Sequence, residues 1–231
     1  MAQAPVTVRY EEVASRARNA CLRAGRDPQT VEIMVVTKYA GINSVAELAQ
    51  SGLIRHIAES RIADAAAKWA DPLLFPFSDK VTKHFIGRLQ TNKAGKAVAF
   101  ADSIDSIDSS RLAETVSRKA QEAGKTLPVL IQIKLTDRDT QGGLGEKEAR
   151  DLAATAGRLP NLKVNGYLAI APIAGNPEDL RPLFRRVKQI FDADFPQKGG
   201  VLSLGMSGDF EIAVEEGSTL PRIGSAIFGG N

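Results

Sequence analysis

Cysteine, histidine and aromatic residues are scarce in this 231-residue sequence, and its net charge is small. The single cysteine, Cys21, cannot form an internal disulfide, which fits a reducing cytoplasm, and two histidines are too few for a histidine-rich metal site. A net charge of +3 spread along the chain indicates neither nucleic acid nor a membrane as a partner. No apolar run approaches the roughly 20 residues that span a bilayer, and the amino terminus lacks the layout of a signal peptide. The remaining composition, 43% hydrophobic and 25% charged, is typical of a soluble folded protein.

The sequence instead contains short apolar runs that alternate with longer amphipathic stretches, a pattern typical of a parallel sheet covered by helices. An opening helix is expected over residues 8–24. Strands are expected at residues 31–38, 53–58, 84–87, 100–105, 127–135, 164–170, 201–205 and 220–224. Eight strands interleaved with helices predict an α/β fold, a single (β/α)₈ TIM barrel with an extra N-terminal helix. No linker divides the chain, so we expect one domain over residues 1–231.

Lys38 ends the apolar run IMVVTK of the first expected strand. In such barrels the active groups sit at the C-terminal ends of the strands. Low-dielectric walls at that position would lower the pKa of the lysine amine toward the neutral form that attacks a carbonyl. The alternative is that Lys38 only extends from the barrel mouth, with its stem packed and its ammonium group in water.

A second informative region, residues 202–230, contains two strand ends that each run into glycine and serine. Loops after the seventh and eighth strands of barrels frequently bind phosphate, and here Ser207 and Ser225 would add hydroxyl donors while Gly224 allows close backbone approach. Arg222 would face the same mouth. The alternative is that these are ordinary turn and cap residues. Together with an imine-forming Lys38, such a site could hold a phosphorylated aldehyde, for which pyridoxal 5′-phosphate (PLP) is the obvious candidate.

The blocks VVTKYA, HFIGRLQTNK and LSLGMSGDFEIAVEEGSTLPRIGSAIFG make the chain similar, over residues 10–229, to the YggS/PROSC family of pyridoxal phosphate homeostasis proteins. The resemblance implies the barrel of the alanine racemase N-terminal domain and PLP carried as a Schiff base on Lys38. It implies phosphate contacts from Ser207, Gly224 and Ser225, and an arginine, Arg222, near the pyridine ring. The complete cofactor-binding set that it implies is Lys38, Ser60, Met206, Ser207, Arg222, Gly224 and Ser225, with no metal ligand.

Two segments depart from the family pattern. Ser60 stands where the family usually has an asparagine near the cofactor, so a shorter hydroxyl replaces an amide. After the fifth strand, Lys134, Arg138 and Gln141 stand in a loop where the family has a carboxylate and a second lysine, which reverses the local charge.

The resemblance also suggests what the protein does with PLP. An arginine can only donate hydrogen bonds, so it favours an unprotonated pyridine nitrogen and weakens the ring as an electron sink. Alanine racemase-like enzymes also use a second domain, which we do not expect after residue 231. We therefore expect a PLP carrier that buffers or delivers the cofactor without substantial catalysis. A weak PLP-dependent racemase and a cofactor-free barrel enzyme that forms a Schiff base with a phosphorylated sugar are the alternatives.

Expected partners are PLP itself and apo forms of PLP-dependent enzymes. The basic stretch from residue 80 to residue 96 contains six cationic or histidine side chains but one aromatic, which is typical of a solvated face rather than a nucleic-acid site. We expect no membrane partner and a monomer.

Overall fold

The protein is described by a computed structural model that covers residues 4–135, 142–197 and 199–229. Its strands form one parallel eight-stranded sheet in the order β7-β6-β5-β4-β3-β2-β1-β8. The strands are β1 (Met34–Val36), β2 (His56–Glu59), β3 (Thr82–Phe85), β4 (Ser103–Ile107), β5 (Leu127–Lys134), β6 (Leu162–Ile170), β7 (Val201–Ser203) and β8 (Arg222–Ile223). All eight expected strands are present, and the prediction of a (β/α)₈ barrel is confirmed.

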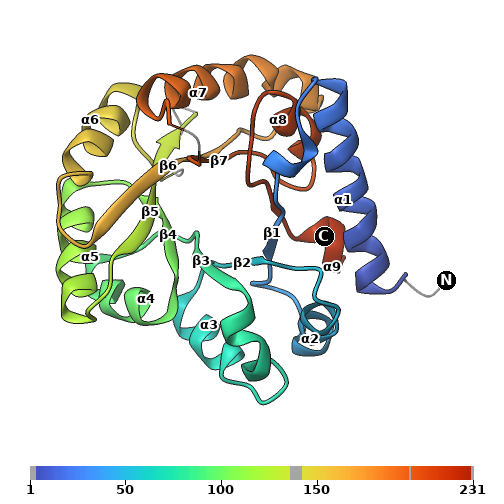
Figure 1. Cartoon of the computed structure of the whole chain (residues 1–231), viewed down its shortest axis with the longest axis horizontal. Coiled ribbons are helices and arrows are strands. Elements are labelled where there is room, and N and C mark those ends of the chain that lie inside the picture. The colour runs from blue at the N-terminus through green and yellow to red at the C-terminus, as the bar shows by residue number, and fades with distance from the viewer. Residues whose placement is uncertain (1–3, 136–141, 198, 230–231) are drawn as a thin grey trace.

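Helices surround the barrel as an outer ring (Figure 1). The α-helices are α1 (Val6–Arg23), α2 (Ile42–Gln50), α3 (Ile62–Trp69), α4 (Ala94–Phe100), α5 (Ser110–Glu122), α6 (Glu146–Ala156), α7 (Arg181–Asp194), α8 (Phe210–Glu215) and α9 (Ser225–Phe228). Short 3₁₀ helices are η1 (Pro28–Thr30), η2 (Phe75–Lys80), η3 (Thr91–Lys93) and η4 (Pro177–Leu180). The expected N-terminal helix is α1, which packs against α8 and α9. The short helices α4 and α9 are additions to the predicted pattern.

Alternation along the strands divides the buried side chains between two cores. One face of each strand carries apolar residues, such as Val35, Ile104 and Ile223, that pack against the helices. On the helix side, Leu112, Val116 and other residues at helical spacing complete this layer. Cys21 lies on the buried face of α1 and is fully buried.

The face that points into the barrel is unusually polar. A small apolar cluster of Met34, Ala58 and Leu220 lies there, and Leu130 and Leu168, which alternate with outward-facing residues of β5 and β6, face the same way. Buried polar residues on the inward-facing positions include His84, Ser103, Asp105, Gln132, Ser203 and Arg222. Because buried charges are stable only when they are paired or hydrogen-bonded, these side chains need partners inside the barrel.

The barrel is closed between β7 and β8 by hydrogen bonds outside the regular strand pairing. The Arg222 amide donates to the Gly205 carbonyl oxygen at 3.0 Å, and the Ser203 hydroxyl donates to the Leu220 carbonyl oxygen at 2.8 Å. Gly205 has a φ of +87°, and a Cβ there would lie 2.6 Å from the Ala213 Cβ. The turn after β7 therefore requires glycine.

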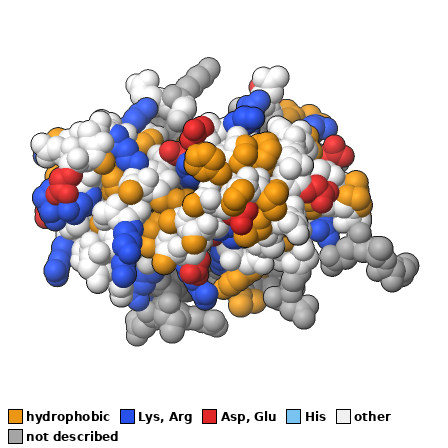
Figure 2. Space-filling view, turned by 90° about the horizontal axis from the view of Figure 1, so that it is seen from below, with side chains coloured by type: hydrophobic (Ala, Val, Ile, Leu, Met, Phe, Trp, Pro, Cys, Tyr) orange, Lys and Arg blue, Asp and Glu red, His pale blue; other side chains and the backbone are white. Residues whose placement is uncertain are grey.

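The outer surface is mixed in character. On the side where α2 and α3 lie, basic, acidic and apolar side chains are intermixed (Figure 2), as the small net charge leads one to expect. Among the described residues, no helix is long and apolar enough to cross a membrane.

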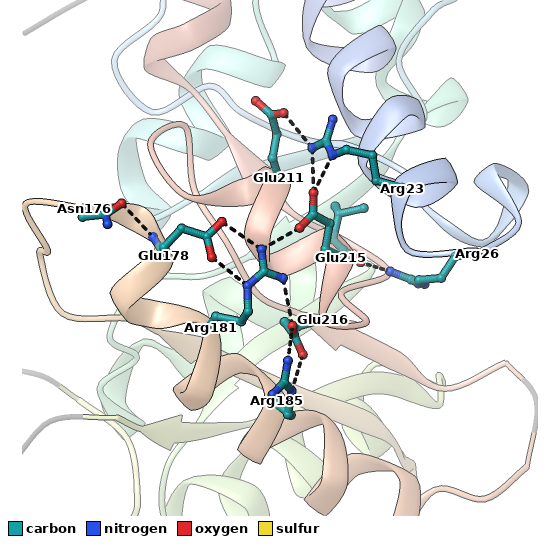
Figure 3. A network of polar contacts seen from close by, with 10 residues as sticks. Arg23, Arg26, Asn176, Glu178, Arg181, Arg185, Glu211, Glu215 and Glu216 are labelled. Atoms are coloured by element: carbon teal, nitrogen blue, oxygen red, sulfur yellow. Dashed lines mark hydrogen bonds and ion pairs between the residues drawn. The ribbon is translucent and has the colours of Figure 1, made fainter.

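A network of ion pairs joins α1, α7 and α8 outside the closure of the barrel (Figure 3). Arg181 lies at its centre and donates to Glu178, Glu215 and Glu216 at 2.7–2.9 Å. From α1, Arg23 reaches Glu215 at 2.7 Å. The network thus ties the extra N-terminal helix to the last two α-helical crossovers of the barrel.

Removing the Arg181 guanidinium tests this network. We expect Arg181→Met to lower the free energy of unfolding by about 1–2 kcal/mol, because three carboxylates lose a donor and then repel one another. Urea denaturation measures the loss. The control is Arg118→Met, which removes an exposed pair with Glu122 one turn along α5 and should cost about 0.5 kcal/mol or less.

The same comparison has an expected pH dependence. Burial would raise the pKa of Glu215, but hydrogen bonds from Arg181 and Arg23 outweigh it and hold this pKa below its usual range. The stability that Glu215 contributes is therefore present above the ordinary glutamate pKa of about 4.3 and is lost as the pH falls through the lower native value. The difference between the wild type and Arg181→Met should shrink in acid. A difference that is constant down to acid pH would contradict the role of the ion pairs.

Candidate functional site

Lys38 lies just beyond the C-terminal end of β1, in the turn that leads to α2. Its side chain is exposed, and its Nζ atom lies 5.2 Å from the centroid of the Tyr39 ring. Arg61 approaches the same ring at 5.9 Å. The expectation of low-dielectric walls around the amine is therefore not met, because the amine stands in the open mouth, as the alternative describes. It is accessible to a ligand from solvent.

Directly behind Lys38, the backbone is held by a half-buried lysine and a buried glutamate. Lys68 of α3 donates to the Thr37 carbonyl oxygen at 2.6 Å and to the Glu59 carboxylate at 3.3 Å. The Thr37 hydroxyl donates to the same carboxylate at 2.6 Å. Only 14% of the Lys68 side chain and 2% of the Glu59 side chain are exposed. Thr37 is thus fixed on both its backbone and its side chain, which gives Lys38 a rigid base.

The loops after β7 and β8 meet beside the end of β1. The Ala226 amide donates to the Ser207 hydroxyl at 3.2 Å, which joins the two loops. A Cβ at Gly224 would lie 3.2 Å from the Val36 carbonyl oxygen, so a larger residue would crowd the junction. Ser225 follows at the start of α9. Within the described residues, the amides of Ser207 and Gly208 donate to no protein acceptor.

These features fit a phosphate group. Two hydroxyls and open amide groups form a donor set on a glycine-lined backbone that allows close approach, and the Asp209 carboxylate of the same turn accepts from the Met206 amide. The strand pairing Val35↔Ile223 keeps this cradle next to the strand that carries Lys38. The sequence-predicted Lys38, Ser207, Gly224 and Ser225 therefore lie on neighbouring strand ends.

Arg222 lies below this mouth, inside the barrel, and is 4% exposed. Its Nη1 donates to the Ser203 carbonyl and hydroxyl oxygens at 2.6 and 2.9 Å, and its Nη2 donates to the Ala169 carbonyl oxygen at 2.8 Å. Burial lowers the pKa of Arg222 to about 10, and the carboxylates of Asp209 and Asp105 oppose this shift. The guanidinium remains charged at neutral pH and keeps two of its five N–H groups for a ligand.

The other predicted residues lie at the same end of the barrel but are less clearly directed at the cradle. Met206 is 39% exposed, and its amide donates to the Asp209 carboxylate, whose pKa is raised by burial. Ser60 follows β2 and is half-buried, with its backbone against Gly87, where a Cβ would collide with the Ser60 carbonyl. Ser60 can therefore shape the opposite rim. Of the altered loop after β5, Lys134 is half-buried at the strand end, whereas Arg138 and Gln141 lie outside the described residues.

Sequence reasoning missed Thr37, Glu59 and Lys68. A glutamate at the end of an apolar strand is a signal that a buried cation must be near, but the sequence does not identify Lys68 as that cation. The partner lies nine residues away on the next helix and becomes visible only when α3 is packed against the barrel wall.

An eight-stranded parallel α/β barrel with a lysine at the end of its first strand and serine- and glycine-containing loops after its last two defines the class of this protein. The family model described as alanine racemase, N-terminal domain, matches residues 10–231. The chain is 34% identical over 226 residues to the pyridoxal phosphate homeostasis protein of Aquifex aeolicus, covering 96% of both chains. It is 36% identical to the protein of the same name from a Synechocystis species, covering 87% of this chain and 92% of the relative. The chain belongs to the family of pyridoxal phosphate homeostasis proteins, within this wider alanine racemase-like group.

Solved structures agree with this assignment. PipY of Synechococcus elongatus with PLP bound superimposes with a TM-score of 0.78 at 32% identity, covering 94% of this chain and 100% of that one. Alanine racemase of Clostridium difficile superimposes with a TM-score of 0.72 at 13% identity and shares the fold. This chain covers 56% of that enzyme.

The support behind Lys38 can be tested by substitution. We expect Lys68→Met to lower the free energy of unfolding by about 3 kcal/mol, because it leaves the Glu59 carboxylate buried without its cation. The double variant Lys68→Met/Glu59→Gln should recover part of this loss, since glutamine is neutral and still accepts from the Thr37 hydroxyl. Urea denaturation of both variants measures the effect. A double variant no more stable than Lys68→Met would rule out the charge as the cause.

Proposed function

We propose that this chain binds PLP as a Schiff base on Lys38 and serves PLP homeostasis, holding and releasing the cofactor, in one barrel domain over residues 1–231. The observation that carries the proposal is the convergence of an exposed amine, an anion cradle and a buried arginine at one end of the barrel. Support comes from relatives named for PLP homeostasis and from the PLP-bound structure of PipY.

When bound, PLP supplies an aldehyde whose carbon bonds to a lysine nitrogen with loss of water. Lys38 is the residue with the right chemistry and position, because its exposed amine stands beside the junction of β1 and β8. Lys68 and Glu59 hold Thr37 in place, and this restricts the positions that the neighbouring Lys38 amine can reach. The protein contribution at this point is orientation of the amine.

The phosphate of the cofactor fits the cradle of Ser207, Gly224 and Ser225. Hydroxyls and open amides donate hydrogen bonds to phosphate oxygens, and the small residues let the backbone approach. The Ser207 hydroxyl already accepts from the Ala226 amide, so its own proton is directed by that bond and can be donated to an anion.

Arg222 suits the pyridine nitrogen. Its carbonyl contacts with Ser203 and Ala169 fix the guanidinium, and the remaining N–H groups can only donate. A donor that cannot give up its proton leaves the ring nitrogen unprotonated and disfavours carbanion chemistry. Binding and release are therefore favoured over turnover of an amino acid, and an open mouth with an exposed Lys38 agrees with this role.

The remaining parts of the proposal concern partners. Delivery to apo PLP-dependent enzymes, a cytoplasmic location and a monomeric state are predictions. Ser60 and Met206 are proposed to contact the cofactor from the rim, since both lie at the mouth.

Lys38→Ala tests the Schiff base. We expect the purified wild type to show a visible absorption band and, after borohydride reduction, a peptide adduct on Lys38 by mass mapping. The variant should lose both while unfolding at nearly the wild-type urea concentration, because the side chain is exposed. Lys134→Ala, which removes another lysine at a strand end of the same mouth, is the matched control and should keep the band.

A reduced adduct on Lys134 would show that the lysine is misassigned. A wild-type protein that stays colourless after incubation with PLP would favour the cofactor-free Schiff-base enzyme. Exchange of the α-proton of an added amino acid by the loaded protein would instead favour the racemase.

A further inference from the structure

Both histidines of the chain lie in one hydrogen-bonded row that crosses the inside of the barrel from β1 to β4. His56 Nε2 lies 2.9 Å from the Glu32 carboxylate, just before β1. His56 Nδ1 lies 3.0 Å from His84 Nε2, and His84 Nδ1 lies 2.8 Å from the Asp105 carboxylate. Nothing in the proposed cofactor chemistry uses this row.

The row requires one more proton than two neutral imidazoles provide. Three contacts of hydrogen-bond length each need one hydrogen, and ionised carboxylates can only accept. Two neutral imidazoles carry two hydrogens. The third must therefore lie on a carboxyl group or convert one ring to imidazolium.

The surroundings of each group decide where that proton lies. Burial would raise the pKa of Glu32, but hydrogen bonds from His56 and Arg55 together outweigh it and hold this pKa below its usual range, so Glu32 stays ionised. Burial and the neighbouring His84 lower the pKa of His56, so His56 stays neutral. Asp105 is fully buried and also accepts from the Ser103 hydroxyl at 2.5 Å, a set of donors that suits a carboxylate.

We propose that His84 is an imidazolium at neutral pH, locked between Asp105 and neutral His56, and that this row exchanges its proton with water at the amino-terminal end of the barrel. His84 then donates from both ring nitrogens, while His56 accepts at Nδ1 and donates to Glu32 from Nε2. This arrangement gives each of the three contacts one hydrogen.

A route for the proton is present. Glu32, His56 and His84 line a cavity of about 990 Å³ that opens at the end of the barrel opposite Lys38. Other charged groups lining it are Arg26, Asp27, Lys188 and Asp192. Lys188 pairs with Asp192, and Arg55 pairs with Glu32 at 3.0 Å. Asp105 is the inner end of the row and is closed to solvent.

The row also reaches the cofactor end of the barrel, a step that rests on the proposed function. Asp105 is one of two carboxylates that act on Arg222. When His84 is charged, its imidazolium compensates part of the negative charge of Asp105. Loss of that proton would strengthen the effect of this carboxylate on Arg222. His84 is thus a positioning residue for the charge that Arg222 presents to the ring nitrogen.

Nitrogen-15 NMR of the imidazole rings tests the proposal in the full chain without added PLP. Two histidines give two sets of ring signals, which His84→Gln assigns by removing one set. At pH 7.5, above the ordinary histidine pKa of about 6.5, we expect three ring N–H groups, two of them on His84. Two neutral rings, or a doubly protonated His56, would overturn the proposal.

Two isosteric variants distinguish the contributions of the two carboxylates at the ends of the row. Asp105→Asn should reduce the ring protons from three to two, because an amide does not stabilise an imidazolium. Glu32→Gln is the control and should leave His84 doubly protonated, since Asp105 remains. If Asp105→Asn does not fold, the wild-type and Glu32→Gln spectra still decide the matter.

The proposed effect of His84 on Arg222 is tested by a separate measurement. In the PLP-loaded protein, the pH at which the visible band changes should move in His84→Gln relative to the wild type, and an unchanged profile would overturn the link. A protein that shows the His84 imidazolium but never forms a visible band would overturn the proposed function and leave the protonated row intact.

Discussion

The structure depends on how the barrel closes between β7 and β8. These two strands stand at opposite ends of the strand order, and the connection between them is made by Arg222, Ser203 and the turn at Gly205. Three neutral acceptors on two strands surround one permanent cation. A buried guanidinium is costly unless its donors are used, so the hydrogen bonds that place the cation also stabilise this edge. The ion-pair network of α1, α7 and α8 supports the same seam from outside (Figure 3).

The buried Arg222 is accompanied by other polar side chains inside the barrel. An arginine inside a small barrel takes part of the space that layers of apolar side chains commonly fill. Asp105, Ser103 and the histidine row then supply charge and hydrogen bonds where alkyl side chains would otherwise lie. The apolar burial that stabilises the fold is displaced to the layer between strands and helices, where the large hydrophobic cluster lies. Function and stability are thus divided between the two faces of the same strands.

Much of this could be predicted from the sequence. The strands were recognisable because each is a short apolar run, and Lys38 stood out because a charge ends the first of them. The conformation of Lys38 was not predictable, since an exposed and an enclosed amine follow the same strand pattern. Lys68 and the histidine row were also missed: their partners come from different elements, and pairing depends on which strands become neighbours. Helix α9 is too short to leave a periodic signal.

Lys38 combines an exposed side chain with a backbone that is fixed by its neighbours. Forming and hydrolysing a Schiff base both require water to leave or enter, so an amine in an enclosed pocket would retain its cofactor longer than one in an open mouth. An amine with no fixed base, however, would sample many orientations and bind weakly. Here the mobile part is one side chain, whereas Thr37 below it is clamped by Lys68 and Glu59 and the neighbouring cradle is fixed at Gly224. A rigid base under a solvated amine is the combination that the proposed capture and release of the cofactor would need, whereas repeated turnover would need the amine and its proton acceptor to be shielded together.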